Sequence, residues 1–158
     1  MGKYEKLLNE AENKVIVIEK YFKSDAKGLC KGRKVGISKA IQTSHEKVCI
    51  LAEELGHYYT TCGEIIDQSI LDNRRQERRA RAWAYEKLVP ISSFINAYER
   101  RLQGRHELAE LLDVTEDFIN EALEHYKGKY GLYINMGEYT IMFEPLHVIK
   151  KIRGGMDG

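Results

Sequence analysis

The sequence predicts a mainly helical α+β fold, in which a short three-stranded sheet precedes a winged helix-turn-helix-like tail. The sheet is indicated by a β-branched run at residues 15–18 and by a segment with three glycines at residues 27–37. Helices are indicated by apolar residues three and four positions apart through most of the remaining chain. Pro90 marks the boundary between a domain at residues 1–90 and a tail at residues 91–158.

The first third of the chain predicts one helix and the whole sheet. Tyr4, Leu7, Leu8 and Ala11 follow helical spacing, which indicates a helix over residues 3–13. The run of valine and isoleucine at residues 15–18 indicates a buried strand. The glycines of residues 27–37 interrupt any helix and favour two short strands joined by a turn near Lys31 and Gly32.

Three helices are predicted in the middle of the chain. Thr43, with Glu46 three residues later, is typical of the start of a helix, and Gly63 of its end. A second helix runs from residue 72 to residue 88, where Pro90 ends it. A third helix is capped by Ser92 or Ser93 and closes near Gly104.

The tail predicts a helix pair followed by a hairpin. Apolar residues on helices at residues 106–112 and 115–126, with a turn at Asp113 and Val114, are typical of a helix-turn-helix. Alternation over residues 131–151 indicates a β-hairpin or wing that turns near Met136 and Gly137.

Bulk properties exclude several classes of protein. The formal net charge of +1 implies neither nucleic acid nor membrane as a partner. No apolar run reaches the roughly 18–20 residues that span a bilayer, and no secretory signal is present, so a cytoplasmic location is expected. The three cysteines lack CxxC spacing, which favours reduced thiols over a disulfide framework.

A metal site is suggested by residues 51–57. Glu53 and His57 lie four residues apart, on one face of a helix, and Glu54 between them could act as a general base toward a bound water. By itself this pattern is more often a solvated, charged helix face. The next helix, however, carries Glu77, which could complete the three protein ligands of a catalytic zinc site.

These motifs together resemble the ImmA/IrrE family of metallopeptidases. The segment Leu-Ala-Glu-Glu-Leu-Gly-His-Tyr-Tyr begins at residue 51, Glu-x-x-Ala-x-x-Trp-Ala begins at residue 77, and Leu-Val-Pro ends at residue 90. The family has a histidine at the place of Glu53. The resemblance implies a zincin-like domain and a metallo-endopeptidase that cleaves a DNA-binding repressor of a phage or mobile element.

Carried over by position, the resemblance makes Glu54 the general base and His57 and Glu77 metal ligands, with Glu53 in place of the missing histidine. It implies one divalent metal, with zinc as the first candidate and manganese as the second. Because Glu53 replaces the histidine, a site that holds no metal is a further alternative. A second carboxylate should make the ion a weaker Lewis acid. The sheet edge, with Leu29, Val35 and Ile37, would hold an extended substrate by strand addition.

The alternative is a peptidase fold without catalysis that inactivates a repressor by binding it, which the loss of the histidine motivates. Direct binding of nucleic acid is disfavoured, because the predicted second helix of the tail carries four acidic residues and no Lys or Arg within residues 115–126. Arginines and lysines of residues 74–105 form an ordinary solvated face, a docking surface for an acidic partner or, as a third alternative, a surface for nucleic acid.

Overall fold

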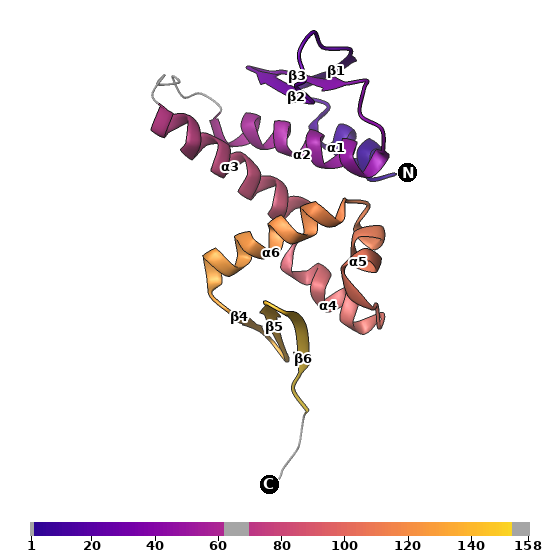
Figure 1. The fold of residues 1–158 in the computed structure, drawn as a ribbon, viewed down its shortest axis with the longest axis vertical. Coiled ribbons are helices and arrows are strands. Elements are labelled where there is room, and N and C mark those ends of the chain that lie inside the picture. Colours follow the sequence, from indigo (N-terminus) through magenta and orange to yellow (C-terminus); the bar gives the residue numbers. More distant parts are fainter. Residues whose placement is uncertain (1, 62–69, 153–158) are drawn as a thin grey trace.

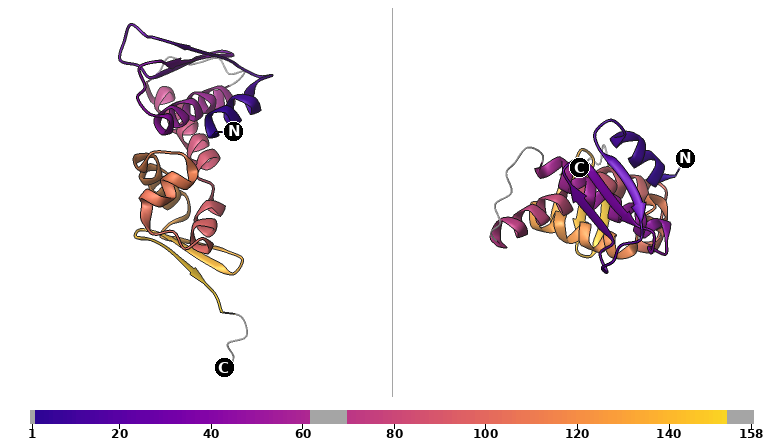
Figure 2. Two further views of the ribbon diagram at one scale, coloured as in Figure 1. Left: turned by 90° about the vertical axis from the view of Figure 1, so that its right-hand side faces the viewer. Right: turned by 90° about the horizontal axis from the view of Figure 1, so that it is seen from above.

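The structure is a computed structural model that describes residues 2–61 and 70–152. Over these residues the fold is mixed α/β, with helices between two small sheets (Figures 1 and 2). The elements are α1 (Lys3–Ala11), β1 (Ile16–Lys20), β2 (Gly28–Lys31), β3 (Lys34–Ser38), α2 (Ser44–Thr61), α3 (Ile70–Leu88), α4 (Ile91–Glu99), α5 (Gly104–Leu112), α6 (Glu116–Tyr130), β4 (Tyr133–Met136), β5 (Tyr139–Phe143) and β6 (Leu146–Lys150). None of the helices in these ranges combines the length and the apolar character that crossing a membrane requires.

The predicted three-stranded sheet is present, in the order β1-β3-β2. Strand β1 runs parallel to β3, and β2 runs antiparallel to it. Val35 and Ile37 of β3 are buried against α2. The predicted first strand is present as β1, but its expected burial is confirmed only in part. Val15 is 4% exposed, whereas Ile16 and Ile18 are 55% and 47% exposed. They point away from α2, and a sheet covered on one face leaves alternate residues of each strand in solvent.

Helices α2 and α3 pack against each other and form the centre of the N-terminal part (Figure 1). As predicted, Thr43 caps α2, since the Glu46 N–H donates to Thr43 Oγ1 at 3.2 Å. The carboxylate of Glu46 does not return the bond but pairs with Lys27. The predicted stop at Gly63 lies outside the described residues.

Helix α4 differs from its prediction at both ends. It begins at Ile91, directly after Pro90, and no side chain caps it. Ser93 lies inside the first turn, where its hydroxyl donates to the Pro90 carbonyl at 2.5 Å. Pro90 therefore occupies the N-cap position with an extended backbone, at φ of −63° and ψ of 157°, and provides no side-chain cap. The helix ends at Glu99, before the predicted stop near Gly104.

The tail contains the predicted helix pair α5 and α6. Asp113 adopts a left-handed conformation with φ of 57° and ends α5. Thr115 then caps α6, since its hydroxyl accepts from the Phe118 N–H at 3.1 Å. The structure leaves the assignment of this pair as a winged helix-turn-helix, and the division at Pro90, as predictions.

The segment after α6 forms a three-stranded antiparallel sheet, in the order β4-β5-β6, rather than the predicted hairpin. The turn at Gly137 is confirmed, with a φ of 60° that suits glycine. Ile141 and Phe143 of the central strand are buried at 0% and 2% exposure. They join the same buried cluster as the core of α2 and α3.

Helix α6 is bonded along one side of α3. The Tyr85 hydroxyl donates to Glu121 at 3.1 Å, and His125 and Lys129 both contact Glu86 at 2.8 to 3.1 Å. At the end of α3, the buried Tyr126 hydroxyl donates to the Val89 carbonyl at 2.7 Å. These bonds place the tail firmly against the helix that carries Glu77.

Candidate metal centre

The candidate centre depends on an unusually close approach of α2 and α3. A Cβ atom at Gly56 would lie 2.3 Å from the Ala80 carbonyl oxygen and 2.9 Å from its carbon. The backbones of the two helices are therefore in close contact, and there is no space for a side chain at residue 56. Because Gly56 lies beside His57 and Ala80 is three residues from Glu77, this contact brings the two predicted ligands together.

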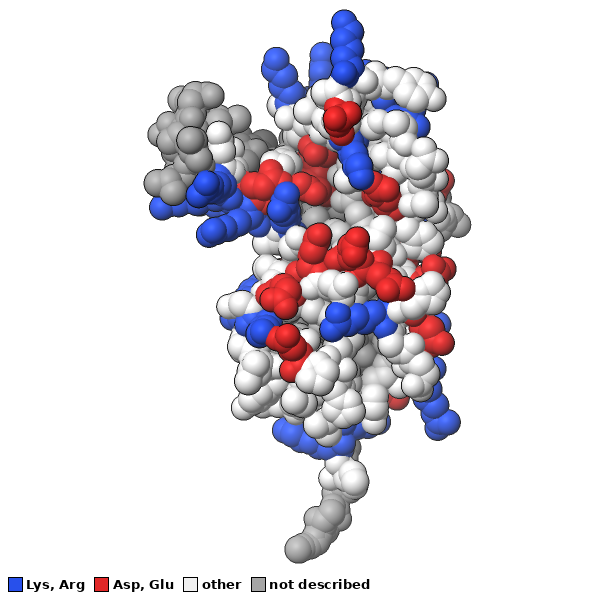
Figure 3. Space-filling model, viewed as in Figure 1, with Lys and Arg blue, Asp and Glu red and all other residues white. Residues whose placement is uncertain are grey.

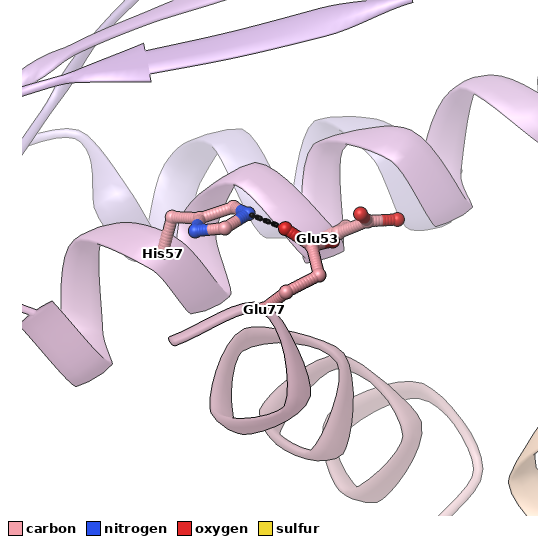
Figure 4. Close-up of side chains that lie close together, drawn as sticks. All are labelled: Glu53, His57 and Glu77. Carbon is pink, nitrogen blue, oxygen red and sulfur yellow. Dashed lines mark ion pairs between the residues drawn. The ribbon is translucent and has the colours of Figure 1, made fainter. Parts of the chain in front are cut away.

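Three of the predicted site residues meet at this crossing. His57 Nε2 lies 3.1 Å from Glu77 Oε2, and Glu53 lies one helical turn before His57 (Figure 4). One ligand atom from each of the three lies within 4.8 Å of those of the other two. All three side chains are half-buried, at 24% to 35% exposure, so solvent and ions can reach them.

The donors at this crossing fit one divalent ion. Two carboxylates and one imidazole are a donor set that Zn²⁺ accepts, and three protein ligands leave a position open for water or substrate. Donors around one Zn²⁺ lie about 3.4 Å apart, given bond lengths near 2.1 Å. The spacing of up to 4.8 Å therefore requires small side-chain rotations.

Glu54 lies deeper than the three candidate ligands. Its side chain is buried at 8% exposure and lies against β2, where a Cβ at Gly28 would come within 2.8 Å of its Cγ. Burial, followed by the charges of Glu53 and Glu77, raises the pKa of Glu54 to about 7. A glycine at residue 28 thus makes room for a carboxyl that can exchange its proton near neutral pH.

The two ligand carboxylates interact with each other and with an arginine. Burial raises the pKa of Glu53 to about 7, aided by its hydrogen bond with Glu77 and opposed by Arg81. Burial also acts to raise the pKa of Glu77, but the bond with Glu53 and the charges of His57 and Arg81 outweigh it and lower that pKa. A proton between the carboxyls therefore resides on Glu53.

Arg81 is a member of the site that the sequence analysis missed. Its Nε donates to Glu77 Oε1 at 3.0 Å and lies 3.6 Å from Glu53 Oε1. Figure 3 shows acidic side chains gathered where α2 and α3 cross, with Lys and Arg side chains beside them along α3. The four-residue spacing from Glu77 is the signal that could have identified Arg81.

The predicted substrate residues are placed differently from one another. Leu29 on β2 is 54% exposed. Val35 and Ile37 belong to β3 and are buried, with exposed fractions of 1% and 0%. The structure does not bring these three side chains together at one surface. Their role toward a substrate, like the catalytic and metal roles above, stays a prediction.

The raised pKa of Glu54 should make the metal-free protein less stable as pH rises from 4.5 to about 7. In that window the unfolded chain has lost the proton that folded Glu54 still holds, so the free energy of unfolding falls with pH. The pKa difference corresponds to about 3 kcal/mol.

The measurement is urea unfolding in the presence of a chelator at several pH values. Glu54→Gln should show a shallower decline than the wild type over this window. Glu124→Gln, at an exposed position of α6, is the matched control and should keep the wild-type slope. Identical slopes for all three proteins would contradict the assignment.

Comparison with known proteins identifies the domain. The family model Peptidase_M78, described as an IrrE N-terminal-like domain, matches residues 6–124. This match includes the N-terminal sheet, the crossing of α2 and α3, and the tail helices as far as most of α6. No curated protein and no solved structure matches the chain. Because the match covers most of its length, the chain belongs to the Peptidase_M78 family of IrrE N-terminal-like metallopeptidases.

Proposed function

We propose that the protein is a metal-dependent endopeptidase that cleaves a DNA-binding repressor of a phage or mobile element. The observation that carries the proposal is the convergence of Glu53, His57 and Glu77 beside the buried Glu54, within a domain of a peptidase family. A divalent ion, zinc first and manganese second, would be held by these three side chains and would supply Lewis acidity toward the scissile carbonyl.

In this proposal Glu54 acts first as the general base and then as the general acid. It accepts a proton from the attacking water and then gives it to the leaving amine, so that the peptide bond is broken and no net proton is held. Burial is the largest cause of the raised pKa of Glu54, and a general base is most effective when its pKa is raised toward the working pH. Its burial against Gly28 keeps the carboxyl from turning out toward bulk solvent.

The substrate would bind as an extra strand along β2. Lys27 O accepts from the Ser38 N–H at 2.9 Å, and in an antiparallel pair such contacts alternate along the strand. Gly28 and Cys30 therefore direct their N–H and C=O groups to the outer edge, which no described strand covers. An extended polypeptide bonded to Gly28 would lie next to Glu54.

The proposed partner is a protein rather than DNA itself. Helix α6 presents Glu116, Asp117, Glu121 and Glu124 to solvent, and these charges would be repelled by phosphates. A repressor bound through its polypeptide chain avoids this repulsion. A cytoplasmic location is part of the same proposal, since repressors act on DNA there.

The test of the metal site is a metal titration of wild type and His57→Ala. The chelator-treated wild type should bind one Zn²⁺ or Mn²⁺ per chain, and removal of the imidazole should weaken binding by more than about 100-fold, beyond what second-sphere changes cause. His147→Ala is the control, because His147 is exposed on β6, away from the crossing of α2 and α3. Absence of stoichiometric metal in the wild type, even in excess Zn²⁺ or Mn²⁺, would favour the non-catalytic binder.

A further inference from the structure

Arg81 holds both candidate ligand carboxylates. From the turn of α3 that follows Glu77, its Nε donates to Glu77 Oε1 and faces Glu53 Oε1. The other oxygen of Glu77 faces His57. Each carboxylate of the set is therefore engaged by a group of this chain, and the guanidinium remains charged at any pH at which the protein is folded.

A divalent ion and this guanidinium would share the same two carboxylates. Arg81 Nε faces Oε1 of Glu53 and bonds to Oε1 of Glu77, whereas His57 faces Oε2 of Glu77. A metal ligand directs an oxygen lone pair at the ion, and Glu53 Oε1 has Arg81 as its cationic neighbour. Two cations within a few ångströms repel each other. When Glu53 is ionised, either cation relieves its repulsion with Glu77, as the proton on Glu53 does at lower pH. Only one of the two cations can be closest to the Glu53 carboxylate at a time.

We propose that Arg81 is an internal counter-cation that competes with the metal ion for Glu53. In this view metal binding is an exchange: the ion takes the Glu53 carboxylate, and the Arg81 side chain turns outward into solvent, where 55% of it already lies. The inference rests on the proposed metal site. The charge of Arg81 would then make metal affinity lower than that of the same three ligands without the arginine.

A different role for Arg81 would give the opposite sign. Groups that bond to a metal ligand often orient it, and their loss lowers metal affinity by about 10- to 100-fold. If Arg81 serves to aim Glu77, removing it weakens binding. If Arg81 competes for Glu53, removing it tightens binding, because the metal-free state loses its neutralising charge and the loaded state loses a repulsion.

The experiment is a titration of chelator-treated protein with Zn²⁺, and separately with Mn²⁺, against a competing chromophoric chelator. Arg81→Met keeps the length of the side chain and removes its charge, and should bind the ion about 10- to 100-fold more tightly, the size typical of changes next to a metal ligand. Arg81→Lys keeps the charge and should stay near the wild type. Arg78→Met, at an exposed arginine of the same helix, removes the same charge away from the ligands and should also stay near the wild type.

A second measurement separates folding from binding. Thermal unfolding should show Arg81→Met less stable than the wild type in chelator and more strongly stabilised by added Zn²⁺, since ligand binding stabilises in proportion to affinity. Metal bound by Arg81→Met alone, and not by the wild type, would also support the competition. Weaker or unchanged affinity in Arg81→Met, with the wild type binding metal, overturns the competition and leaves the metal site standing. No binding by either protein overturns both.

Discussion

Glu54→Gln should lower the rate of repressor cleavage by about 10²- to 10⁴-fold, the contribution typical of a general base. Glutamine has nearly the same shape, so it can occupy the buried position against Gly28, but it cannot accept the proton of the attacking water. Metal content should stay at the wild-type level, because Glu54 is not one of the three side chains with converging ligand atoms.

The measurement is the accumulation of repressor fragments with metal-loaded enzyme, followed by mass spectrometry. Glu124→Gln serves as the control for a carboxylate replaced elsewhere on the surface and should cleave normally. Equal cleavage by wild type and Glu54→Gln would remove Glu54 from the mechanism. Release of an intact repressor from DNA by both proteins would instead favour inactivation by binding.

Gly56→Ala should destabilise the protein by about 1–3 kcal/mol, the usual cost of inserting a methyl group where no space exists. The added Cβ would lie 2.3 Å from the Ala80 carbonyl oxygen, which belongs to the backbone of α3 and cannot rotate away. The two helices must therefore move apart. Since His57 and Glu77 lie on opposite sides of this contact, metal affinity should fall as well.

Gly128→Ala is the matched control for this substitution. Gly128 lies within α6, and a Cβ there would meet no atom within 4 Å. Alanine should therefore stabilise the protein by about 0.5–1 kcal/mol, since glycine is costly inside a helix. Urea unfolding of the two variants gives the comparison. Equal stability of Gly56→Ala and the wild type would show that the close crossing is not required.

The parts of the fold that sequence patterns predicted are those specified locally. The strands around residues 28–38, the Thr43 cap and the α5–α6 pair follow from spacing and turn chemistry over a few residues. Which face of a sheet is covered depends on the whole chain, so the exposure of Ile16 and Ile18 was missed. The third strand of the tail sheet was missed for the same reason, because its pairing is defined by β5 and not by its own residues.

The candidate site shows the same division. Glu53, Glu54 and His57 share one helix, so their relation follows from the sequence. Glu77 was a candidate because it lies on the next helix, and the resemblance to a family supported the choice. Gly56 and Ala80 gave no signal of their contact, because the fit between two helices appears only when both are in place. Arg81 looked like one of many arginines until its distances to two carboxylates distinguished it.

The hydrogen bonds between α6 and α3 connect the tail to the helix that carries Glu77. Tyr85 and Glu86 of α3 and Val89 directly after it each contact α6, and all three follow Glu77 and Arg81 along the chain. Helix α3 therefore connects the tail with the crossing of α2 and α3. A partner that displaces the tail would therefore displace α3, the helix that carries Glu77. Because His57 and Glu53 lie on α2, such a displacement would change the distance between Glu77 and the other two candidate ligands.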